Sequence, residues 1–507
     1  MKRFNFHLIG YLIRVFSILF PFVGTMSVYG QIGDLRRVSP ESQGLKSEDV
    51  KSFFDGMMAA KQGEPHGVMV LRNGEVVGEL FPTPFASKYS HTLYSASKTF
   101  VAVAVGMAVD ENRLRLTDRV ATFFPEMLPD TVSEDLANMT VRDLLTMTSG
   151  IRPDWLMRTS GANWVRRYLR KTVLYHPGEH FDYDSMSTYL LSAILQKVTG
   201  MKLLDYLRPR LFEPMHITEV DWEESPEGIN TGGWGLHLQV ASMAKFGQLL
   251  LNRGKWGDTQ LVSAKWVDEM TSALQVTGMA DAYGYQVWRC DYPEAYRADG
   301  ALGQYIIVAP REQMVVAITQ ANIGNGVAER QLVWNLLRTA RERALPEGKG
   351  FPALLEAERR YQLPVVPGKG SSKIINSLVG KELRLNANGL DWKSVKIDIN
   401  KNGLSLTVTN IENQSYQVDL GRGEWRTSHT EVCPPYSIRA VGRFSGIKRD
   451  FYVAGCYGGE SDLTIRLRYT NWVSGMDLVF SQTKNGSLRL MVKETAKRGA
   501  YELTFVD

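Results

Sequence analysis

The first clear pattern along the chain is a pair of apolar runs joined by a two-residue turn. Residues 67–71 and 76–77 flank Asn73-Gly74, and Asn-Gly between apolar runs is the strongest short signal of a β-hairpin. A helical pattern appears much later, over about 328–343, with apolar residues on one face. It follows three apolar runs typical of strands, at residues 285–288, 305–308 and 314–318.

Between these strand patterns the sequence is mainly helical. Residues 99–109 are apolar nearly all round, which is typical of a helix buried in a core. Asp110-Glu111-Asn112 ends this helix, and helical patterns continue to about residue 275. Strands at both ends with helices between them predict a sheet that is interrupted by a helical insertion. The two ends of this region must therefore meet in space.

The C-terminal part of the chain has a different pattern. Residues 346–372 carry several prolines and glycines and are predicted to be a linker after a first domain at 31–345. From 373 to 507 apolar and polar residues alternate, as in 395–399 and 463–469, with an Asn402-Gly403 turn. This alternation predicts an antiparallel β domain, either a small barrel or a sandwich. We see no catalytic grouping in it, and expect it to stabilise the protein or to flank the substrate.

The N-terminus has the pattern of a signal peptide. Lys2 and Arg3 precede a mostly apolar run at residues 15–26, and small residues follow. Arg14 interrupts the apolar stretch, so a membrane-spanning helix of about 20 residues is hard to build. We expect residues 1–30 to be removed and the protein to be exported, periplasmic or secreted, without a stable membrane span. The alternative is a retained N-terminal anchor.

Composition and charge exclude some classes of partner. The chain has 507 residues, of which 44% are hydrophobic and 22% charged, as in ordinary globular proteins. The net charge of +5 comes from 59 basic and 54 acidic residues, and no dense Lys/Arg tract contains interleaved aromatics. Nucleic acid is therefore not an expected partner. The oligomeric state stays open.

Cysteine and histidine positions favour a protein without a metal site. Cys290, Cys433 and Cys456 are an odd number and cannot form a complete disulfide framework. Cys433 and Cys456 could pair in an oxidising compartment, or all three could be free thiols. There is no CxxC motif, and His176 and His180 surround a Pro-Gly turn that prevents a regular helix. We expect no metal and no organic cofactor.

Ser95 and Lys98 stand where an extended segment enters the buried helix. A spacing of three puts both side chains on one helix face, about 5–6 Å apart at Cβ. The helix N-terminus adds unpaired N–H groups and a positive dipole end beside the serine. A lysine whose pKa is lowered by burial can take the serine proton. The pair alone is weak evidence, because Ser95 could simply cap the helix while Lys98 is solvated.

The surrounding sequence strengthens this pair. It resembles the serine β-lactamase and penicillin-binding-protein-like superfamily, especially its class C-type branch of esterases, D-aminopeptidases and hydrolases of short nylon oligomers. The similar stretches, in the family's order, are residues 94–100, 105–111, 114–118, 124–126, 141–151 and 235–252. The likeness covers roughly residues 40–345. It implies a β-lactamase/transpeptidase-like α/β fold, in which an antiparallel sheet is flanked by helices and carries an all-helical insertion at about 110–275.

Tyr183 and Ser185 stand where this family has its second catalytic element, a tyrosine followed two residues later by Asn or Ser. A phenol whose pKa is lowered by a nearby ammonium can exchange protons with a nucleophile and a leaving group. The resemblance therefore implies that Tyr183 is a general acid/base and that Ser185 is a polar, substrate-binding contact. The family often has Asn at this position, and Ser185 has a shorter reach.

Ala298-Asp299-Gly300 stands where the family has Lys-Thr-Gly or His-x-Gly, so the basic first residue is absent. Gly300 would let substrate approach the strand edge closely. By the same resemblance, the Ala301 N–H would pair with the Ser95 N–H as an oxyanion hole. In the family the missing cation usually holds the carboxylate of penicillins and peptidoglycan stems. Its loss weakens the β-lactamase and carboxypeptidase interpretations.

Together these features predict an exported serine hydrolase that cleaves an ester or amide bond of a small-molecule or peptide substrate. The acyl-enzyme would form on Ser95, with Lys98 and Tyr183 as general base and acid. One alternative is a penicillin-binding-type D-amino-acid peptidase or weak β-lactamase, against which Ala298 counts. Another is a non-catalytic binding protein on the same fold, against which the joint presence of the three catalytic residues counts.

Overall fold

In a computed structural model of the protein, the described residues are 35–154, 163–278, 281–401, 403–435, 447 and 450–506. The predicted signal peptide at 1–30 lies outside these ranges. Within them, no helix is both long enough and apolar enough to cross a membrane.

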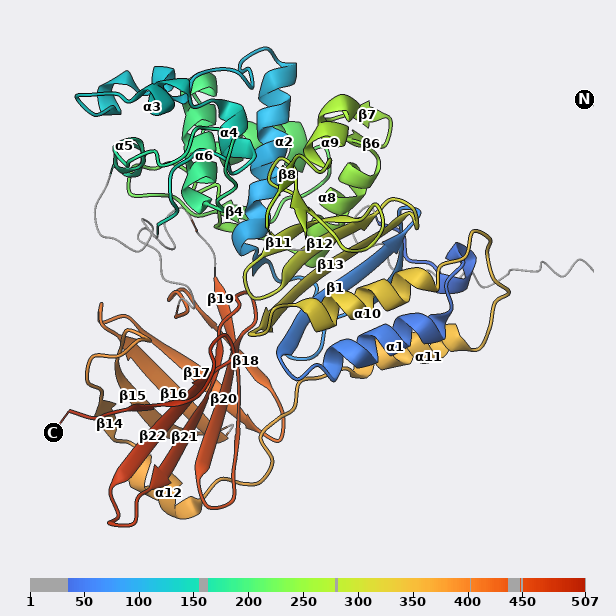
Figure 1. Cartoon of the computed structure of the whole chain (residues 1–507). Coiled ribbons are helices and arrows are strands. Elements are labelled where there is room, and N and C mark those ends of the chain that lie inside the picture. Colours follow the sequence, from blue (N-terminus) through green and yellow to red (C-terminus); the bar gives the residue numbers. More distant parts are fainter. Residues whose placement is uncertain are drawn as a thin grey trace, which may run out of the picture.

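An eight-stranded antiparallel sheet forms the centre of the first domain, in the order β2-β1-β13-β12-β11-β10-β9-β8 (Figure 1). β1 (Gly63–Arg72) pairs with β13 (Met314–Asn322) along its length, so the two ends of the domain meet as predicted. Asn73 and Gly74 have φ of 51° and 81°, as a tight hairpin turn into β2 requires. The other strands are β2 (Glu75–Leu80), β8 (Gln275–Val276), β9 (Ala282–Tyr283), β10 (Trp288–Arg289), β11 (Tyr296–Gly300) and β12 (Gln304–Ala309).

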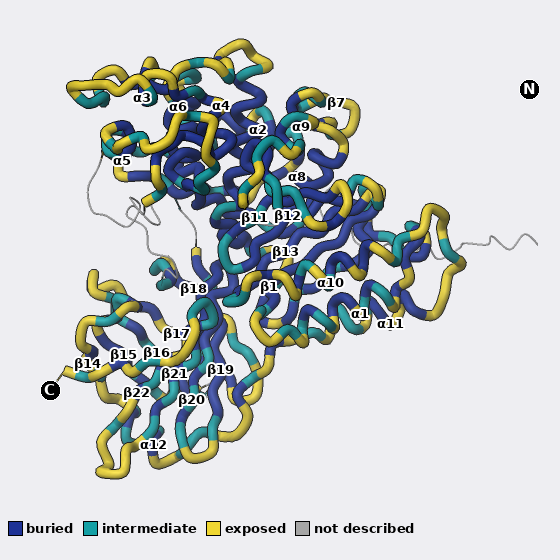
Figure 2. The backbone as a smooth tube through the Cα atoms, in the orientation of Figure 1, coloured by how far each residue is buried: buried dark blue, intermediate teal, exposed yellow. Residues whose placement is uncertain are grey.

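Both faces of this sheet are covered, so successive strand residues are buried on opposite sides. In β1, Met69 and Leu71 pack into the core under the helical insertion. Val68 and Val70 pack into a second core on the other face. That face is covered by α1 (Ser47–Met58), α10 (Val327–Arg338) and α11 (Gly350–Arg360) (Figure 1). Figure 2 shows the central strands as almost continuously buried.

The helical insertion covers the first face of the sheet. The helix α2, which leads into this insertion, is buried from Ser97 to Ala108, and its residues from Phe100 to Ala108 are apolar on every side. Gly106 makes room for a neighbour, since a Cβ there would lie 2.4 Å from the Trp266 indole. The helices are α2 (Ser97–Asp110), α3 (Glu134–Asn138), α4 (Val141–Leu145), α5 (Trp164–Leu169), α6 (Ser185–Thr199), α7 (Leu203–Leu207), α8 (Val240–Leu251) and α9 (Ala264–Met270). Small sheets are formed by β3 (His91–Thr92), β4 (Val220–Trp222) and β5 (Leu236–Leu238), and by β6 (Lys255–Trp256) and β7 (Thr259–Gln260).

The prediction of an irregular linker at 346–372 is wrong for residues 350–360, which form α11. Pro352 lies in the first turn of this helix, where a proline is tolerated. Phe351 and Leu354 are buried in the same core as α1. The proline and glycine signals therefore mark the flanks of a helix that packs on the first domain.

The C-terminal strands form one long sheet that curls on itself (Figure 1). Asn386 N donates to Thr504 O at 3.0 Å and Val506 N donates to Arg384 O at 3.0 Å, which joins the first strand to the last. Of the two predicted forms, the domain is therefore a closed barrel. Its elements are α12 (Ser372–Leu378), β14 (Glu382–Arg384), β15 (Trp392–Asn400), β16 (Gly403–Asn410), β17 (Ser415–Arg422), β18 (Arg426–Thr430), β19 (Phe451–Gly458), β20 (Leu463–Tyr469), β21 (Gly475–Gln482), β22 (Leu488–Glu494) and β23 (Tyr501–Leu503).

The predicted strand at 285–288 is wrong for residues 285–287, since of this run only Trp288 lies in β10. Gln286 has φ of 57°, which interrupts an extended strand, and its side-chain amide donates to Leu145 O at 2.8 Å.

All three cysteines are free, so Cys433 and Cys456 do not pair.

Candidate active site

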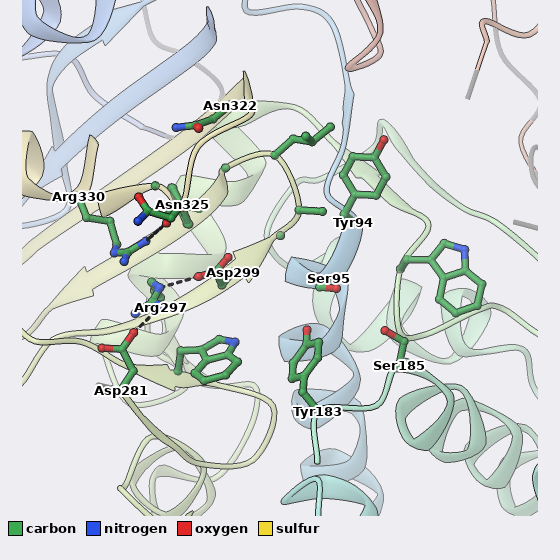
Figure 3. Close-up of a pocket in the computed structure, with 18 of the residues that line it drawn as sticks. Tyr94, Ser95, Tyr183, Ser185, Asp281, Arg297, Asp299, Asn322, Asn325 and Arg330 are labelled. Atoms are coloured by element: carbon green, nitrogen blue, oxygen red, sulfur yellow. Dashed lines mark hydrogen bonds and ion pairs between the residues drawn. The ribbon is translucent and has the colours of Figure 1, made fainter. Parts of the chain in front are cut away.

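Ser95 lies on a tight turn between β3 and α2. Residues 94–96 form one turn of 3-10 helix, and Tyr94 has φ of 46°, which is uncommon for a residue other than glycine. The Ser97 hydroxyl donates to Tyr94 O at 2.6 Å and accepts from Leu236 N at 3.1 Å. These two bonds fix the turn against β5. Ser95 is thereby held at the wall of a cavity (Figure 3).

Lys98 lies beneath this turn with its ammonium nitrogen directed at Ser95. The Nζ is 2.9 Å from Ser95 Oγ, 3.0 Å from Ser185 Oγ and 2.6 Å from the carbonyl oxygen of Gly233. Lys98 is only 1% exposed. Burial lowers its pKa to about 7, although the nearby Asp184 carboxylate acts in the opposite direction. A substantial share of the amine is therefore neutral at pH 7 and able to accept a proton from Ser95.

Tyr183 approaches Ser95 from the loop that precedes α6. Its phenol points toward Ser95 (Figure 3). The Lys98 Nζ lies 4.9 Å from the centroid of the Tyr183 ring. Burial raises the pKa of this phenol well above its ordinary value. The nearby ammonium does not lower the phenol pKa below its ordinary value, because desolvation outweighs the other influences. The phenol keeps its proton at neutral pH and is suited to donate it.

A cavity of about 750 Å³ brings the remaining predicted residues together. Ser95, Tyr183, Ser185, Gly300 and Ala301 all line it. Figure 3 shows the first three around the cavity. The residues come from the nucleophile-side turn, from the start of α6 and from the end of β11. The structure thus places every sequence-predicted site residue around one space, with Lys98 bonded to two of them from below.

Close packing in the fold explains why residue 300 is a glycine, which the sequence did not reveal. A Cβ at this position would lie 2.1 Å from Leu93 O and 3.3 Å from Ala96 N. The glycine is therefore required for β11 to pack against the turn that carries Ser95. This close packing places Ala301 and Ser95 on the wall of the same cavity.

The family model described as Beta-lactamase matches residues 50–337, which is more than half of the chain. The chain belongs to the β-lactamase family. The family match agrees with the β-lactamase/transpeptidase-like fold predicted from the sequence, and a solved structure of that fold superposes on this chain.

Three relatives illustrate the extent of the likeness. Protein flp of Staphylococcus aureus strain MRSA252 is 26% identical over 189 residues, which cover 34% of this chain and only 37% of that protein. The 6-aminohexanoate-dimer hydrolase of Paenarthrobacter ureafaciens is 24% identical over 278 residues, or 49% of this chain and 70% of the relative. A family VIII carboxylesterase superposes with a TM-score of 0.50 and 16% identity, covering 60% of this chain and 98% of that structure, and shares the fold.

One wall of the cavity departs from the β-lactamase-family pattern. Ala298 stands where the family has a cation, and it is 3% exposed, in the core under the helical insertion. Its neighbours Arg297 and Asp299 line the cavity instead. Arg297 Nε is 2.8 Å from Asp299 Oδ2, and Arg297 Nη2 is 2.8 Å from Asp281 Oδ2. Two carboxylates therefore share one guanidinium at this wall.

Sequence reasoning missed these charged residues, although a signal was present. Side chains alternate along a strand, so positions 297, 299 and 301 share one face. Because the resemblance put Ala301 at the site, the same alternation predicts that Arg297 and Asp299 lie there too. Arg330 from α10 lines the same wall, and no local pattern links it to residues 297–301.

Asp184 was also missed. It is buried, it caps the N-terminus of α6, and its Oδ1 accepts from Met186 N at 3.0 Å. Burial raises its pKa to about 6. An aspartate directly before a helix is a recognised capping signal, but its proximity to Lys98 is a tertiary fact. The rings of Tyr283 and Trp288, at 6.2 Å and 5.6 Å from the Tyr183 ring, complete the surroundings.

Proposed function

We propose that this β-lactamase-family hydrolase cleaves an ester or amide bond of a small substrate through an acyl-enzyme on Ser95. The observation that carries the proposal is the buried Lys98 Nζ, 2.9 Å from Ser95 Oγ, with a pKa of about 7. The activities in the names of two relatives, a 6-aminohexanoate-dimer hydrolase and a carboxylesterase, support hydrolysis as the reaction.

Acylation begins when neutral Lys98 takes the Ser95 proton while Oγ bonds to the substrate carbonyl carbon. The carbonyl π electrons move to oxygen, and the N–H groups of Ser95 and Ala301 donate to that oxyanion. When the carbonyl re-forms, the bond to the leaving group breaks. The leaving group takes the Tyr183 proton, and the Lys98 ammonium returns a proton to Tyr183.

Deacylation repeats these steps with water in place of Ser95. Lys98 accepts a proton from water, and the oxygen bonds to the acyl carbon. The ester bond to Ser95 then breaks, the carboxylic acid product is released, and Ser95 Oγ regains a proton from the Lys98 ammonium. Ser185 supports both halves of the cycle because its hydroxyl accepts from Lys98 Nζ and holds the amine in place.

Labelling with a fluorophosphonate tests the nucleophile directly. We expect one adduct on Ser95 in the folded protein and none in Ser95→Ala, and we expect Lys98→Ala to lose p-nitrophenyl ester turnover. Ser487→Ala and Lys373→Ala, at exposed positions of the C-terminal domain, are matched controls that retain both signals. Absence of an adduct on the folded wild type would favour the non-catalytic binding protein. Unchanged turnover in Lys98→Ala would remove Lys98 from the mechanism.

The cavity wall formed by Arg297 and Asp299 counts against the penicillin-binding-type alternative. Asp299 lines the cavity and Ala298 supplies no cation, so a substrate carboxylate meets no lysine at this position. We therefore propose that esters and amides without such a carboxylate are better substrates than β-lactams or stem peptides. Parallel assays with short-chain p-nitrophenyl esters, D-amino-acid peptides and a chromogenic cephalosporin test this order. Fastest turnover of the cephalosporin would reverse it.

We also propose export after removal of residues 1–30, which rests on the basic and apolar pattern of the N-terminus. N-terminal sequencing of the protein from periplasmic and secreted fractions is expected to begin near residue 31. Recovery of the full-length chain from membranes would instead indicate a retained anchor.

A further inference from the structure

The turn between β20 and β21 of the barrel is buried, although turns normally lie on the surface. Its five residues, 470–474, are between 0% and 5% exposed, and Trp472 is 0% exposed. This end of the barrel lies beside the first domain, near β11 and β12 (Figure 1).

Two contacts join this hairpin to the first domain. The Trp472 indole packs on the His237 ring of β5, with 4.7 Å between ring centroids. At the end of β20, Arg468 forms a two-bond ion pair with Glu64 of β1, at 2.7 Å and 2.8 Å. His237 and Arg468 are both buried, at 0% and 5% exposure. The hairpin is therefore anchored on β1 of the central sheet and on β5, which pairs with β3 just before the Ser95 turn.

The segment that Trp472 contacts also holds the Ser95 turn. Leu236, beside His237, accepts from Leu93 N at 2.9 Å and donates from its own N to Ser97 Oγ at 3.1 Å. A few residues earlier, the Gly233 carbonyl accepts from Lys98 Nζ at 2.6 Å. Residues 233–237 thus bond to the chain on both sides of Ser95 and to its candidate base.

The opposite wall of the site rests on the barrel as well. Ala301 and Leu302 pack against the hydrophobic cluster of the barrel, and Tyr94 is a member of that cluster. Leu302 has φ of 63°, so the turn after β11 has an unfavourable backbone conformation that its surroundings must hold. The turn that carries Ser95 and the turn that carries Ala301 therefore both pack against one surface of the C-terminal domain.

We infer that the barrel holds the active-site turns in their catalytic geometry, and that Trp472 is a positioning residue for the two turns carrying Ser95 and Ala301. This inference rests on the proposed function. Oxyanion stabilisation depends on donors held at hydrogen-bond distance from the developing charge. By filling the space beside β5, Trp472 prevents a displacement of residues 233–237 that would move Ser95 and Lys98 relative to Ala301.

The test compares three variants of the full chain with a p-nitrophenyl ester, after fluorophosphonate titration of the active sites. Trp472→Ala removes the contact, and Trp472→Phe keeps an aromatic ring in place. Trp392→Ala empties an equally buried position elsewhere in the barrel cluster and is the matched control for destabilisation. Expressing kcat per labelled site separates positioning from folding, because a merely destabilised variant loses sites while each surviving site keeps its kcat.

We expect kcat per labelled site to fall at least about 10-fold in Trp472→Ala, since a displacement of about 1 Å at a reacting centre costs about 100-fold. KM should change much less, Trp472→Phe should restore most of the rate, and Trp392→Ala should keep kcat per site. A wild-type kcat per site in Trp472→Ala, or an equal loss in Trp392→Ala, would overturn the inference. Failure of the proposed function looks different, because the wild type itself would then neither label nor turn over.

Discussion

The pH dependence of acylation measures directly what burial does to Lys98. With a pKa of about 7, the neutral fraction of the amine is about 10% at pH 6 and about 90% at pH 8. Because only the neutral amine accepts the Ser95 proton, kcat/KM for an ester should rise about 10-fold over this interval and then level off. A lysine with its ordinary pKa of about 10.4 would instead give a rise of about 10-fold per pH unit up to pH 10.

Replacement of Asp184 by Asn assigns the titration to Lys98. The Asp184 carboxylate raises the pKa of Lys98 against the dominant effect of burial, so its removal should move the midpoint below 7. Asn also caps helices well, which preserves the start of α6. Asp268→Asn, at an exposed ion pair with Arg253, is the matched control and should leave the midpoint unchanged.

The assay is stopped-flow release of p-nitrophenol under single-turnover conditions, where acylation is observed alone. A flat profile between pH 6 and 8, or a rate that falls as pH rises, would refute the assignment of Lys98 as the base. An equal shift in Asp184→Asn and Asp268→Asn would show that the titrating group is not Lys98.

Three further predictions address packing and stability. Gly300→Ala should lose most ester turnover and about 1–3 kcal/mol of unfolding free energy, because the added Cβ would lie 2.1 Å from Leu93 O. Gly389→Ala is the control, since no atom would lie within 4 Å of the added Cβ, and it should change neither quantity in the same kinetic and thermal assays. Arg468→Met should destabilise the protein to urea by about 3–5 kcal/mol, since it removes the two-bond ion pair from the partly buried Glu64 carboxylate. An unchanged midpoint would contradict this. Burial raises the pKa of Glu64, but the attraction of Arg468 lowers this pKa by a larger amount, and the net value is about 2. Glu64 therefore stabilises the fold above about pH 4.5, and this stabilisation is lost as pH falls towards 2. Denaturant titrations at pH 6 and pH 3 should therefore show a smaller acid loss in Glu64→Gln than in the wild type, and equal losses would refute the linkage.

Local sequence rules predicted the parts of the site that depend on helix geometry. Ser95 lies in the 3-10 turn that leads into α2 and Lys98 lies in the first turn of α2, and their spacing of three, about one helical turn, brings the two side chains together. The meeting of β1 with β13 followed from strand patterns on both sides of a helical region. The same rules failed at residues 350–360, where proline and glycine suggested irregular chain although Phe351 and Leu354 provide an apolar helix face.

The sequence by itself determined which residues could do chemistry and in what order they occur, because turn signals, helix spacing and the family's motifs are all local properties. Only the tertiary structure decided their state. The pKa of Lys98 is set by desolvation within packed helices and by a carboxylate 86 positions away, Asp184. The Gly233 carbonyl that accepts from Lys98 belongs to a segment 135 positions away. Desolvation and hydrogen bonding act through space between distant parts of the chain, so no window of sequence contains them.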